Sequence, residues 1–328
     1  MTDVRHAGTI YHVLRAEDGK VMAGLRALIG SQPAPDLGPA GRSAFDAMMS
    51  QTPAASGVAY SDDSIGGVPG VWCRPPGCVD GAAILYLHGG AYVVGSAPAY
   101  RHLAGQIALR SNAPLFIAEY GLAPEQPFPR AAEDAAAAYR GLEKLGCKAI
   151  AIVGDSAGGG LALITAAAIA RAAHDGTTAR LAGVVAMSPW TDLALTGASL
   201  TTRAAHDPLL TSGALERCRD LYLGSADPSD PRASPLHGDV GDLPPLLFHV
   251  GEDEILLDDS QRFADRVNEA GGRAEVHVWE GMVHVFPANL AVLLAASEAL
   301  DGIGAFLRII LGGLDAVAAP LFPKEPLP

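Results

Sequence analysis

Cysteine, basic residues and long apolar runs are scarce in this sequence of 328 residues. Its four cysteines show no CxxC spacing, which argues against a disulfide framework and favours free thiols in a reducing compartment. Lysine and arginine number 23 against 36 aspartates and glutamates, so the net charge is −13 and no basic stripe is available to bind a nucleic acid. The longest apolar run, residues 161–170, is too short to cross a bilayer.

Motifs for cofactors are missing as well. There is no GxxxxGK[ST] and no GxGxxG after a predicted strand, which disfavours nucleotide binding. There is no HExxH and no close cluster of histidine and cysteine, which disfavours a metal site. The first twenty residues hold several charges and no apolar stretch typical of a signal peptide. We therefore expect a cytoplasmic protein that acts on a small molecule, without metal, organic cofactor, nucleic acid or stable membrane insertion.

Apolar residues are abundant instead. Hydrophobic residues make up 49% of the chain and charged residues only 18%, which is ample material for a large core. The length alone suggests two domains, but large α/β folds often run longer as one unit.

From about residue 71, short apolar runs alternate with helical patterns. Strands are predicted at 82–88, 114–118, 149–153, 181–187, 246–250 and 274–278, and helices at 98–110, 130–145, 157–173, 258–270 and 291–311. Continuous apolar strands between helices are typical of a mostly parallel sheet that is covered on both faces.

Two segments fall outside this alternation. Residues 1–70 contain helical patterns at 10–29 and 41–49, followed by a polar, glycine-rich stretch at 56–70. Residues 192–235 contain one helical pattern, at 212–223, among loops rich in aspartate and proline. We interpret 1–50 and 192–235 as additions outside the sheet.

Residues 154–158 read GDSAG, a GxSxG motif between a predicted strand and an alanine-rich helix. This context is the one that a strand-to-helix nucleophile turn requires, because the sharp turn projects the serine from the edge of the sheet. Small neighbours suit such a crowded turn, and a helix N-terminus stabilises developing negative charge. The pattern favours Ser156 as a nucleophile over an idle serine in a glycine-rich turn.

The sequence HGGAY at 88–92 also follows a predicted strand. Glycines there let backbone N–H groups approach a ligand, so this loop and the residue after the nucleophile can together form an oxyanion hole. We expect the amides of Gly89, Gly90 and Ala157 to serve as its donors. His88 is expected to organise its loop.

In a triad built on such a nucleophile turn, the serine comes first in the chain. An acid and then a histidine follow, each after a later strand. His284 follows the last predicted strand, whereas His249 and His277 lie within strands and are expected to be structural. The residues alone do not select the acid, because five acids occur between 251 and 259.

These motifs together resemble the hormone-sensitive-lipase-like family of bacterial esterases, a group of α/β hydrolases. The resemblance rests on HGGAY (88–92), EYGLAPE (119–125), GDSAGG (154–159), SPWTDL (188–193), EILLDD (254–259) and GMVH (281–284), which stand in the family's order. It implies an α/β-hydrolase fold with an eight-stranded, mostly parallel sheet flanked by helices. It also implies a helical cap built from 1–50 and an insertion at about 192–235 of the catalytic domain, 51–328, and a homodimer formed through the last strand and helix.

The resemblance selects Glu254 rather than Asp253 as the triad acid, because EILLDD matches the family's acid segment without a gap. The sequence departs from the family pattern at Ala91, where a third glycine is usual, and at Gly121, where an arginine is common. The expected activity is hydrolysis of short-chain carboxylic esters by Ser156, His284 and Glu254 through an acyl-enzyme. A lactonase or amidase with the same triad, or a non-catalytic ligand-binding protein on this fold, stays open at this point.

Two further residues are candidates for the substrate site. Tyr92 in the HGGAY loop could line the pocket or pack in the core. Asp155, next to the nucleophile, could contact substrate or orient its loop.

Overall fold

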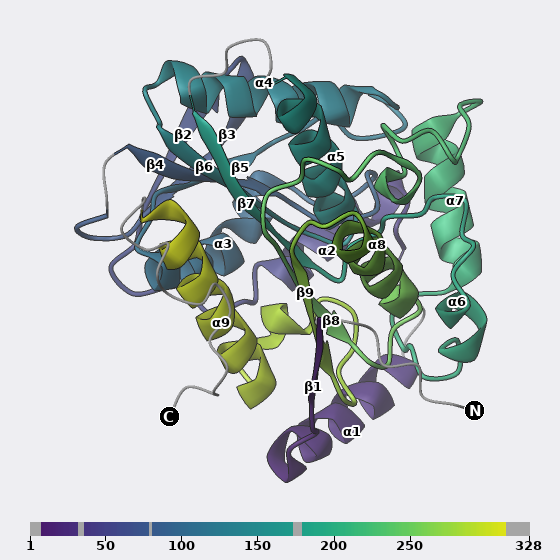
Figure 1. The fold of residues 1–328 in the computed structure, drawn as a ribbon. Helices are drawn as coiled ribbons and strands as arrows, with labels where there is room; N and C mark the ends of the chain where they lie inside the picture. Colours follow the sequence, from purple (N-terminus) through teal and green to yellow (C-terminus); the bar gives the residue numbers. More distant parts are fainter. Residues whose placement is uncertain (1–7, 32–35, 79–80, 173–178, 313–328) are drawn as a thin grey trace.

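The structure is a computed structural model that describes residues 8–31, 36–78, 81–172 and 179–312. One sheet of nine strands runs through the molecule, with helices on both faces (Figure 1). The strands are β1 (Thr9–His12), β2 (Ala59–Ile65), β3 (Val68–Arg74), β4 (Ala82–Leu87), β5 (Leu115–Ala118), β6 (Ala149–Asp155), β7 (Arg180–Met187), β8 (Leu246–Gly251) and β9 (Ala274–Trp279). Their order across the sheet is β1-β9-β8-β7-β6-β4-β5-β3-β2. The seven strands from β1 to β5 in this order pair in parallel, and the β3 and β2 pairings are antiparallel.

Helices of the body cover the two faces of the sheet. The long helices are α1 (Ala16–Gly30), α3 (Ala97–Ser111), α4 (Arg130–Lys144), α5 (Ala157–Ala172), α7 (Ser212–Leu223), α8 (Leu257–Glu269) and α9 (Leu294–Leu311). Shorter ones are α2 (Arg42–Met49), α6 (Ser199–Thr202) and the 3₁₀ turns η1 (Pro39–Gly41), η3 (Pro235–His237) and η4 (Phe286–Asn289). The prediction of an α/β fold with a mostly parallel, doubly covered sheet is confirmed.

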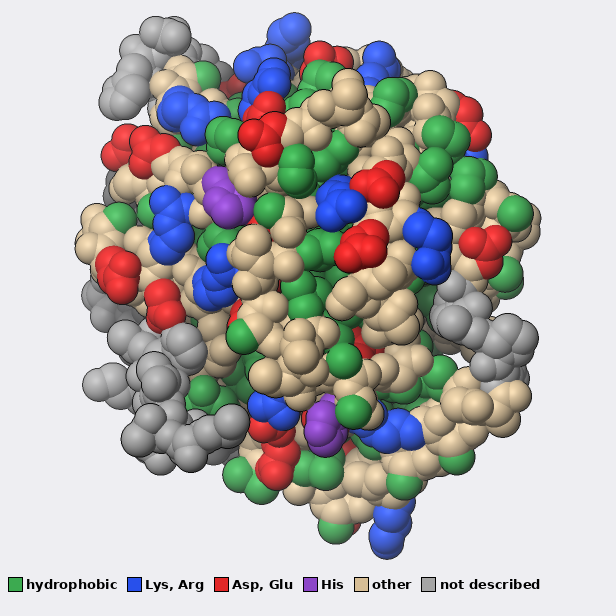
Figure 2. All heavy atoms as spheres, turned by 90° about the vertical axis from the view of Figure 1, so that its right-hand side faces the viewer, with side chains coloured by type: hydrophobic (Ala, Val, Ile, Leu, Met, Phe, Trp, Pro, Cys, Tyr) green, Lys and Arg blue, Asp and Glu red, His purple; other side chains and the backbone are tan. Residues whose placement is uncertain are grey.

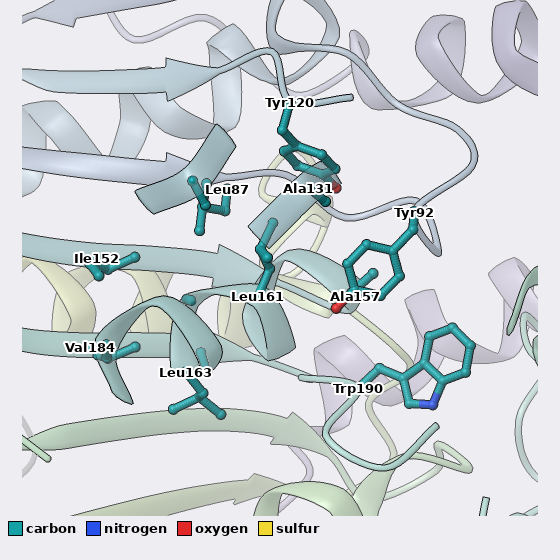
Figure 3. Packing of buried hydrophobic residues seen from close by; sticks show 14 of the residues in the cluster. Leu87, Tyr92, Tyr120, Ala131, Ile152, Ala157, Leu161, Leu163, Val184 and Trp190 are labelled. Carbon is teal, nitrogen blue, oxygen red and sulfur yellow. The ribbon is translucent and has the colours of Figure 1, made fainter. Parts of the chain in front are cut away.

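Alternation of side chains along the central strands divides the core into two layers. Leu85 and Ile152 pack with α4, α5 and α8, whereas their neighbours Ile84 and Ala151 pack with α3 and α9. Figure 3 shows the first layer, in which Leu161 and Leu163 of α5 belong to the same cluster as Ile152 and Val184 of the sheet. Because both faces are covered, every residue of β4, β6 and β8 is buried.

The predicted count of eight strands is wrong. Residues 10–12 were expected to belong to a helix, but Thr9–His12 forms β1, which pairs in parallel with β9, and α1 begins only at Ala16. The strand is only four residues long, and its sequence TIYH does not alternate apolar and polar residues as a predictable strand would. The partner strand, rather than a local pattern, determines its conformation.

The glycine-rich stretch 56–70 also contains an unpredicted strand. Ala59–Ile65 forms β2, the edge strand on the far side of the sheet, and pairs with β3. Gly66 and Gly67 connect the two strands with φ of 65° and 85°, which is the positive-φ pair that a two-residue hairpin prefers. An exposed edge strand can be polar. Asp62 and Asp63 interrupt the apolar pattern by which a strand is predicted, so this strand was missed.

Both predicted additions contain helices in the structure. Residues 8–31 and 36–50, the described parts of the first addition, hold β1, α1, η1 and α2, and residues 192–235 hold α6 and α7. The second addition starts beyond the C-terminal end of β7, at the edge of the sheet where the parallel strands end. No helix of the described residues is long and apolar enough to cross a membrane.

Candidate active site

Ser156 occupies the turn between β6 and α5. Its φ of 53° is left-handed, and Ser156 N donates to Met187 O at 2.8 Å. The neighbouring glycines are required by close packing: a Cβ at Gly154 would lie 2.2 Å from Gly158 O, and one at Gly158 would lie 2.1 Å from Leu87 O. A strained turn with this packing points the serine side chain out of the end of the sheet.

His284 connects Ser156 to Glu254. Its Nε2 lies 2.9 Å from Ser156 Oγ and its Nδ1 lies 2.6 Å from Glu254 Oε2. With Nδ1 donating to the carboxylate, Nε2 is free to accept the serine proton. The three side chains therefore have the geometry of a nucleophile, a base and an acid that orients the base.

Glu254 is fully buried and firmly held. Its second oxygen, Oε1, accepts hydrogen bonds from Gly251 N at 2.6 Å and Ser188 Oγ at 2.8 Å. Ser188 Oγ also accepts from Val285 N at 3.0 Å, so this hydroxyl joins the acid loop to the histidine loop. Ser188 was not among the predicted site residues. The SPWTDL motif was its only signal, and a motif does not state what a serine contacts.

Asp253, the rival acid, points elsewhere. Its Oδ2 accepts from Arg26 Nη2 at 2.6 Å. The geometry thus agrees with the selection of Glu254, although residues 252–256 form turns rather than the extended segment in which neighbouring side chains alternate.

Two opposing effects set the basicity of His284. Burial disfavours the imidazolium, but the charge and hydrogen bond of Glu254 outweigh it, with smaller help from Asp207 and Asp155, and raise the pKa of His284 above its ordinary value.

This shift predicts the pH dependence of activity. Only neutral His284 can accept the serine proton, so kcat/KM should rise with pH through a pKa above about 6.5, the ordinary value for histidine. In Glu254→Gln the carboxylate charge is lost and burial dominates, so this limb should move to lower pH. Initial rates on a neutral ester between pH 5 and 9 test the prediction. A limb at the same pH in both proteins would contradict it.

The amide of Gly89, which was predicted to be an oxyanion donor, already has a hydrogen-bond partner in the structure. Gly89 N donates to Asp155 Oδ1 at 3.0 Å. In contrast, no hydrogen bond among the described residues uses the amides of Gly90, Ala91 or Ala157. Ala91 is therefore a candidate donor that the sequence analysis missed. A backbone donor leaves no side-chain signal, so only the direction of each amide could have identified it.

Asp155 holds the loop between β4 and α3, residues 88–96, which we name the oxyanion loop. The side chain is buried and accepts from Tyr86 Oη at 2.7 Å and Tyr100 Oη at 3.1 Å, in addition to Gly89 N. Burial raises the pKa of Asp155 to about 6, although these three donors oppose the shift. Both carboxylate oxygens accept hydrogen bonds from the protein, which favours the loop-orienting role of Asp155 over contact with substrate.

His88 and Tyr92 also pack within the protein. Tyr120 stacks on the His88 ring and donates its hydroxyl to His88 O at 2.6 Å, in line with the expected role of His88 in organising the loop. The fully buried Tyr92 ring stacks on Tyr222 of α7, with centroids 3.9 Å apart, which favours packing over lining the pocket. The other two expected structural histidines are bonded within the sheet, His249 to Trp279 Nε1 and His277 to Glu275.

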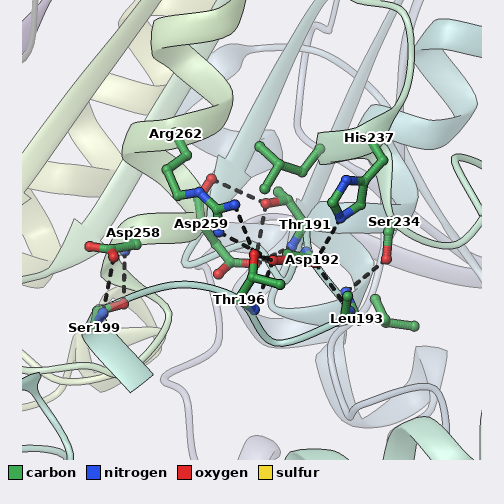
Figure 4. Close-up of polar contacts among 12 residues, drawn as sticks. Thr191, Asp192, Leu193, Thr196, Ser199, Ser234, His237, Asp258, Asp259 and Arg262 are labelled. Carbon is green, nitrogen blue, oxygen red and sulfur yellow. Dashed lines mark hydrogen bonds and ion pairs between the residues drawn. The ribbon is translucent and has the colours of Figure 1, made fainter. Parts of the chain in front are cut away.

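The trailing acids of EILLDD anchor the insertion to α8 (Figure 4). Asp259 accepts from the amides of Thr191 and Asp192, and Asp258 accepts from Ser199 N at 3.0 Å. Burial raises the pKa of Asp259 to about 7 despite these bonds. The insertion is thereby tied to the helix that follows Glu254. Asp192 in turn pairs with Thr196, His237 and Arg262.

Several known proteins are similar to this chain in sequence. A family profile of the α/β-hydrolase fold matches residues 84–288. An acetyl-hydrolase of Streptomyces hygroscopicus is 41% identical over 251 residues, 76% of this chain and 82% of the relative. An ethyl acetate hydrolase of Pseudomonas putida is 37% identical over 238 residues, 69% and 74% of the two chains.

Solved structures of esterases have a similar fold. An esterase from the bacterial hormone-sensitive lipase family superposes with a TM-score of 0.83 at 35% identity, covering 91% of this chain and all of that one. The esterase EstE5, soaked with p-nitrophenyl butyrate, superposes with a TM-score of 0.81 at 35% identity, covering 89% and 99%.

Proposed function

Because the chain belongs to the bacterial hormone-sensitive-lipase family of α/β hydrolases and is a carboxylic ester hydrolase, we propose that Ser156, His284 and Glu254 are its catalytic triad. The observation that carries this proposal is the position of His284, 2.9 Å from the serine hydroxyl and 2.6 Å from the buried carboxylate.

In the proposed mechanism Ser156 Oγ attacks the ester carbonyl while His284 Nε2 takes its proton. The amides of Gly90 and Ala157, with Ala91 as the neighbouring donor, stabilise the tetrahedral oxyanion, where one donor is worth about 3 kcal/mol. His284 then protonates the leaving alcohol. In the second half of the reaction, His284 takes a proton from the water that attacks the acyl-enzyme and returns it to Ser156 Oγ as the carboxylic acid leaves. Glu254 keeps the histidine tautomer and stabilises the imidazolium.

We propose short-chain acyl esters as substrates. Relatives are named acetyl-hydrolase and ethyl acetate hydrolase, and EstE5 was soaked with a butyrate ester. Figure 2 shows the face of the molecule seen from the right of Figure 1, and acidic and basic side chains are interspersed there among hydrophobic ones.

A panel of p-nitrophenyl esters from acetate to palmitate, with a lactone and a p-nitroanilide of matched acyl chain, tests the substrate class. We expect the highest kcat/KM for acetate to butyrate and a steady fall with longer chains. Ser156→Ala serves as the blank. A maximum at laurate or beyond, or faster turnover of the lactone or the anilide than of its matched ester, would contradict the proposal.

We propose that residues 1–50 and 192–235 form a cap over this site. Tyr222 of the insertion stacks on Tyr92 of the oxyanion loop, and Arg42 of α2 donates to Val93 O in the same loop. These contacts support a cap that helps to shape the site and to exclude water.

A cytoplasmic location and a homodimer complete the proposal. All four cysteines are free, which is typical of a reducing compartment. β1, rather than the last strand β9, forms this edge of the sheet. Ile10 within β1 and Val13 just after it are exposed, which favours pairing with a second copy there. Sedimentation equilibrium distinguishes the dimer from a monomer.

A further inference from the structure

The N-terminal addition carries two arginines that reach the loops of the site, Arg26 on α1 and Arg42 on α2. We infer that these arginines are positioning residues: Arg26 holds the loops of the acid and the histidine, and Arg42 holds the oxyanion loop. The inference rests on the proposed triad and adds to it a specific role for the cap in catalysis.

Arg26 joins the two loops that carry Glu254 and His284. Its Nη2 donates to Asp253 Oδ2 at 2.6 Å and to Gly281 O at 3.3 Å. Asp253 directly precedes the acid, and Gly281 lies three residues before the histidine. The Arg26 side chain is 29% exposed and the Asp253 side chain 17%, so water screens the pair only partly. The Arg26 side chain thus helps to fix the distance between the acid and the base.

The insertion supports the same loop from its other side. Arg26 Nη1 donates to His206 O, and Asp207 Oδ2 accepts from Ile255 N at 2.9 Å. Arg203 Nη2 lies 3.4 Å from Glu252 Oε1. Residues on both sides of Glu254 are therefore held by the additions.

Arg42 spans the loops after β4 and β5. Its Nε donates to Val93 O and its Nη2 to Ala123 O, both at 2.8 Å. The same guanidinium binds both oxygens of Glu125, at 3.0 and 2.6 Å. Val93 N in turn donates to Gly90 O at 2.9 Å, which links the arginine to the proposed oxyanion donors.

The oxyanion loop needs such support because its backbone is strained. Ala91 and Tyr92 have φ of 53° and 63°, in the left-handed region that favours glycine. Strained conformations of this kind persist only where the surroundings determine them. Arginine suits the task because its planar fork serves two carbonyls and a carboxylate at once, which a lysine ammonium cannot do.

A merely structural role for both arginines is the alternative. Glu125 is 58% exposed, and ion pairs in such positions contribute little to folding. A structural role would change thermal stability and leave kcat unchanged below the melting temperature. The positioning role lowers kcat while KM stays nearly the same, because the ester is bound but the reacting groups are misplaced.

The test compares Arg26→Gln and Arg42→Gln with Arg15→Gln, a matched control on the N-terminal side of α1. Arg15 pairs with Glu298 at the surface, and it forms no side-chain hydrogen bond or ion pair with either loop among the described residues. We expect kcat on p-nitrophenyl acetate to fall about tenfold to a hundredfold in the first two variants, with KM within about threefold. The kcat of the control should stay within about twofold of the wild-type value, because an exposed ion pair far from the reacting groups contributes little. Arg42→Lys should be as impaired as Arg42→Gln.

A second arm repeats the substitutions in a Glu254→Gln background. Arg26 acts through the acid and the histidine, so its replacement should cost less than about threefold once the acid is gone. Arg42 acts through the oxyanion loop, so its replacement should keep its full factor.

Wild-type kcat in both single glutamine variants, measured below their melting temperatures, overturns the inference, whether or not their stability falls. A full additional loss for Arg26→Gln in the Glu254→Gln background also overturns its assignment to the acid and histidine loops. An undiminished kcat in Glu254→Gln itself would instead contradict the proposed triad, so the two failures are distinguishable.

Discussion

Replacing Ser156 by alanine is expected to lower kcat/KM for a short-chain ester by about four orders of magnitude or more, because a triad acts as a unit. The hydroxyl is bonded to His284 Nε2, and the turn itself is held by backbone hydrogen bonds to β7 and the loop after it. The variant should therefore fold normally and retain only the catalysis that the oxyanion donors supply.

Stopped assays at high enzyme concentration measure this residual rate. Circular dichroism and thermal melting verify the fold, and Ser225→Ala, an exposed serine on the loop after α7, is the matched control. Activity in Ser156→Ala within tenfold of the wild type would exclude Ser156 as the nucleophile.

The second large effect is expected at Glu254. In Glu254→Gln the amide oxygen should stay with Gly251 N and Ser188 Oγ, which turns the NH₂ group toward His284 Nδ1. That arrangement favours the wrong histidine tautomer and removes the charge that stabilises the imidazolium. We expect kcat to fall by about three to four orders of magnitude.

Asp253→Asn is the matched control for this substitution. It changes a carboxylate one residue away that is paired with Arg26 instead of His284. Loosening that pair should cost about tenfold or less, the scale of a small displacement within the site. A larger loss in Asp253→Asn than in Glu254→Gln would reverse the assignment of the acid.

The sequence predicts the parts of this molecule where local pattern and tertiary structure agree. The apolar runs of β4, β6 and β8 are buried on both faces, so their composition alone identified them. Gly154 and Gly158 occur where no Cβ fits, and for that reason GxSxG identifies the turn as well as the serine.

The missed features depend on partners far away in the chain. β1 is a strand because β9 offers a free edge, more than 260 residues later. Gly89 lies in a motif typical of oxyanion donors, but its amide donates to Asp155 at the end of the adjacent strand β6. Ser188 and Arg26 are ordinary residues in the sequence, and only the fold brings them to the loops of Glu254 and His284.

Labelling with a fluorophosphonate tests the central claim most directly. The wild-type protein should lose ester hydrolysis in proportion to the incorporation of one phosphonyl group, and peptide mass spectrometry should locate that group on Ser156. Ser156→Ala should remain unlabelled under the same conditions. A label on another residue that abolishes activity, or full activity in protein completely labelled on Ser156, would contradict the account.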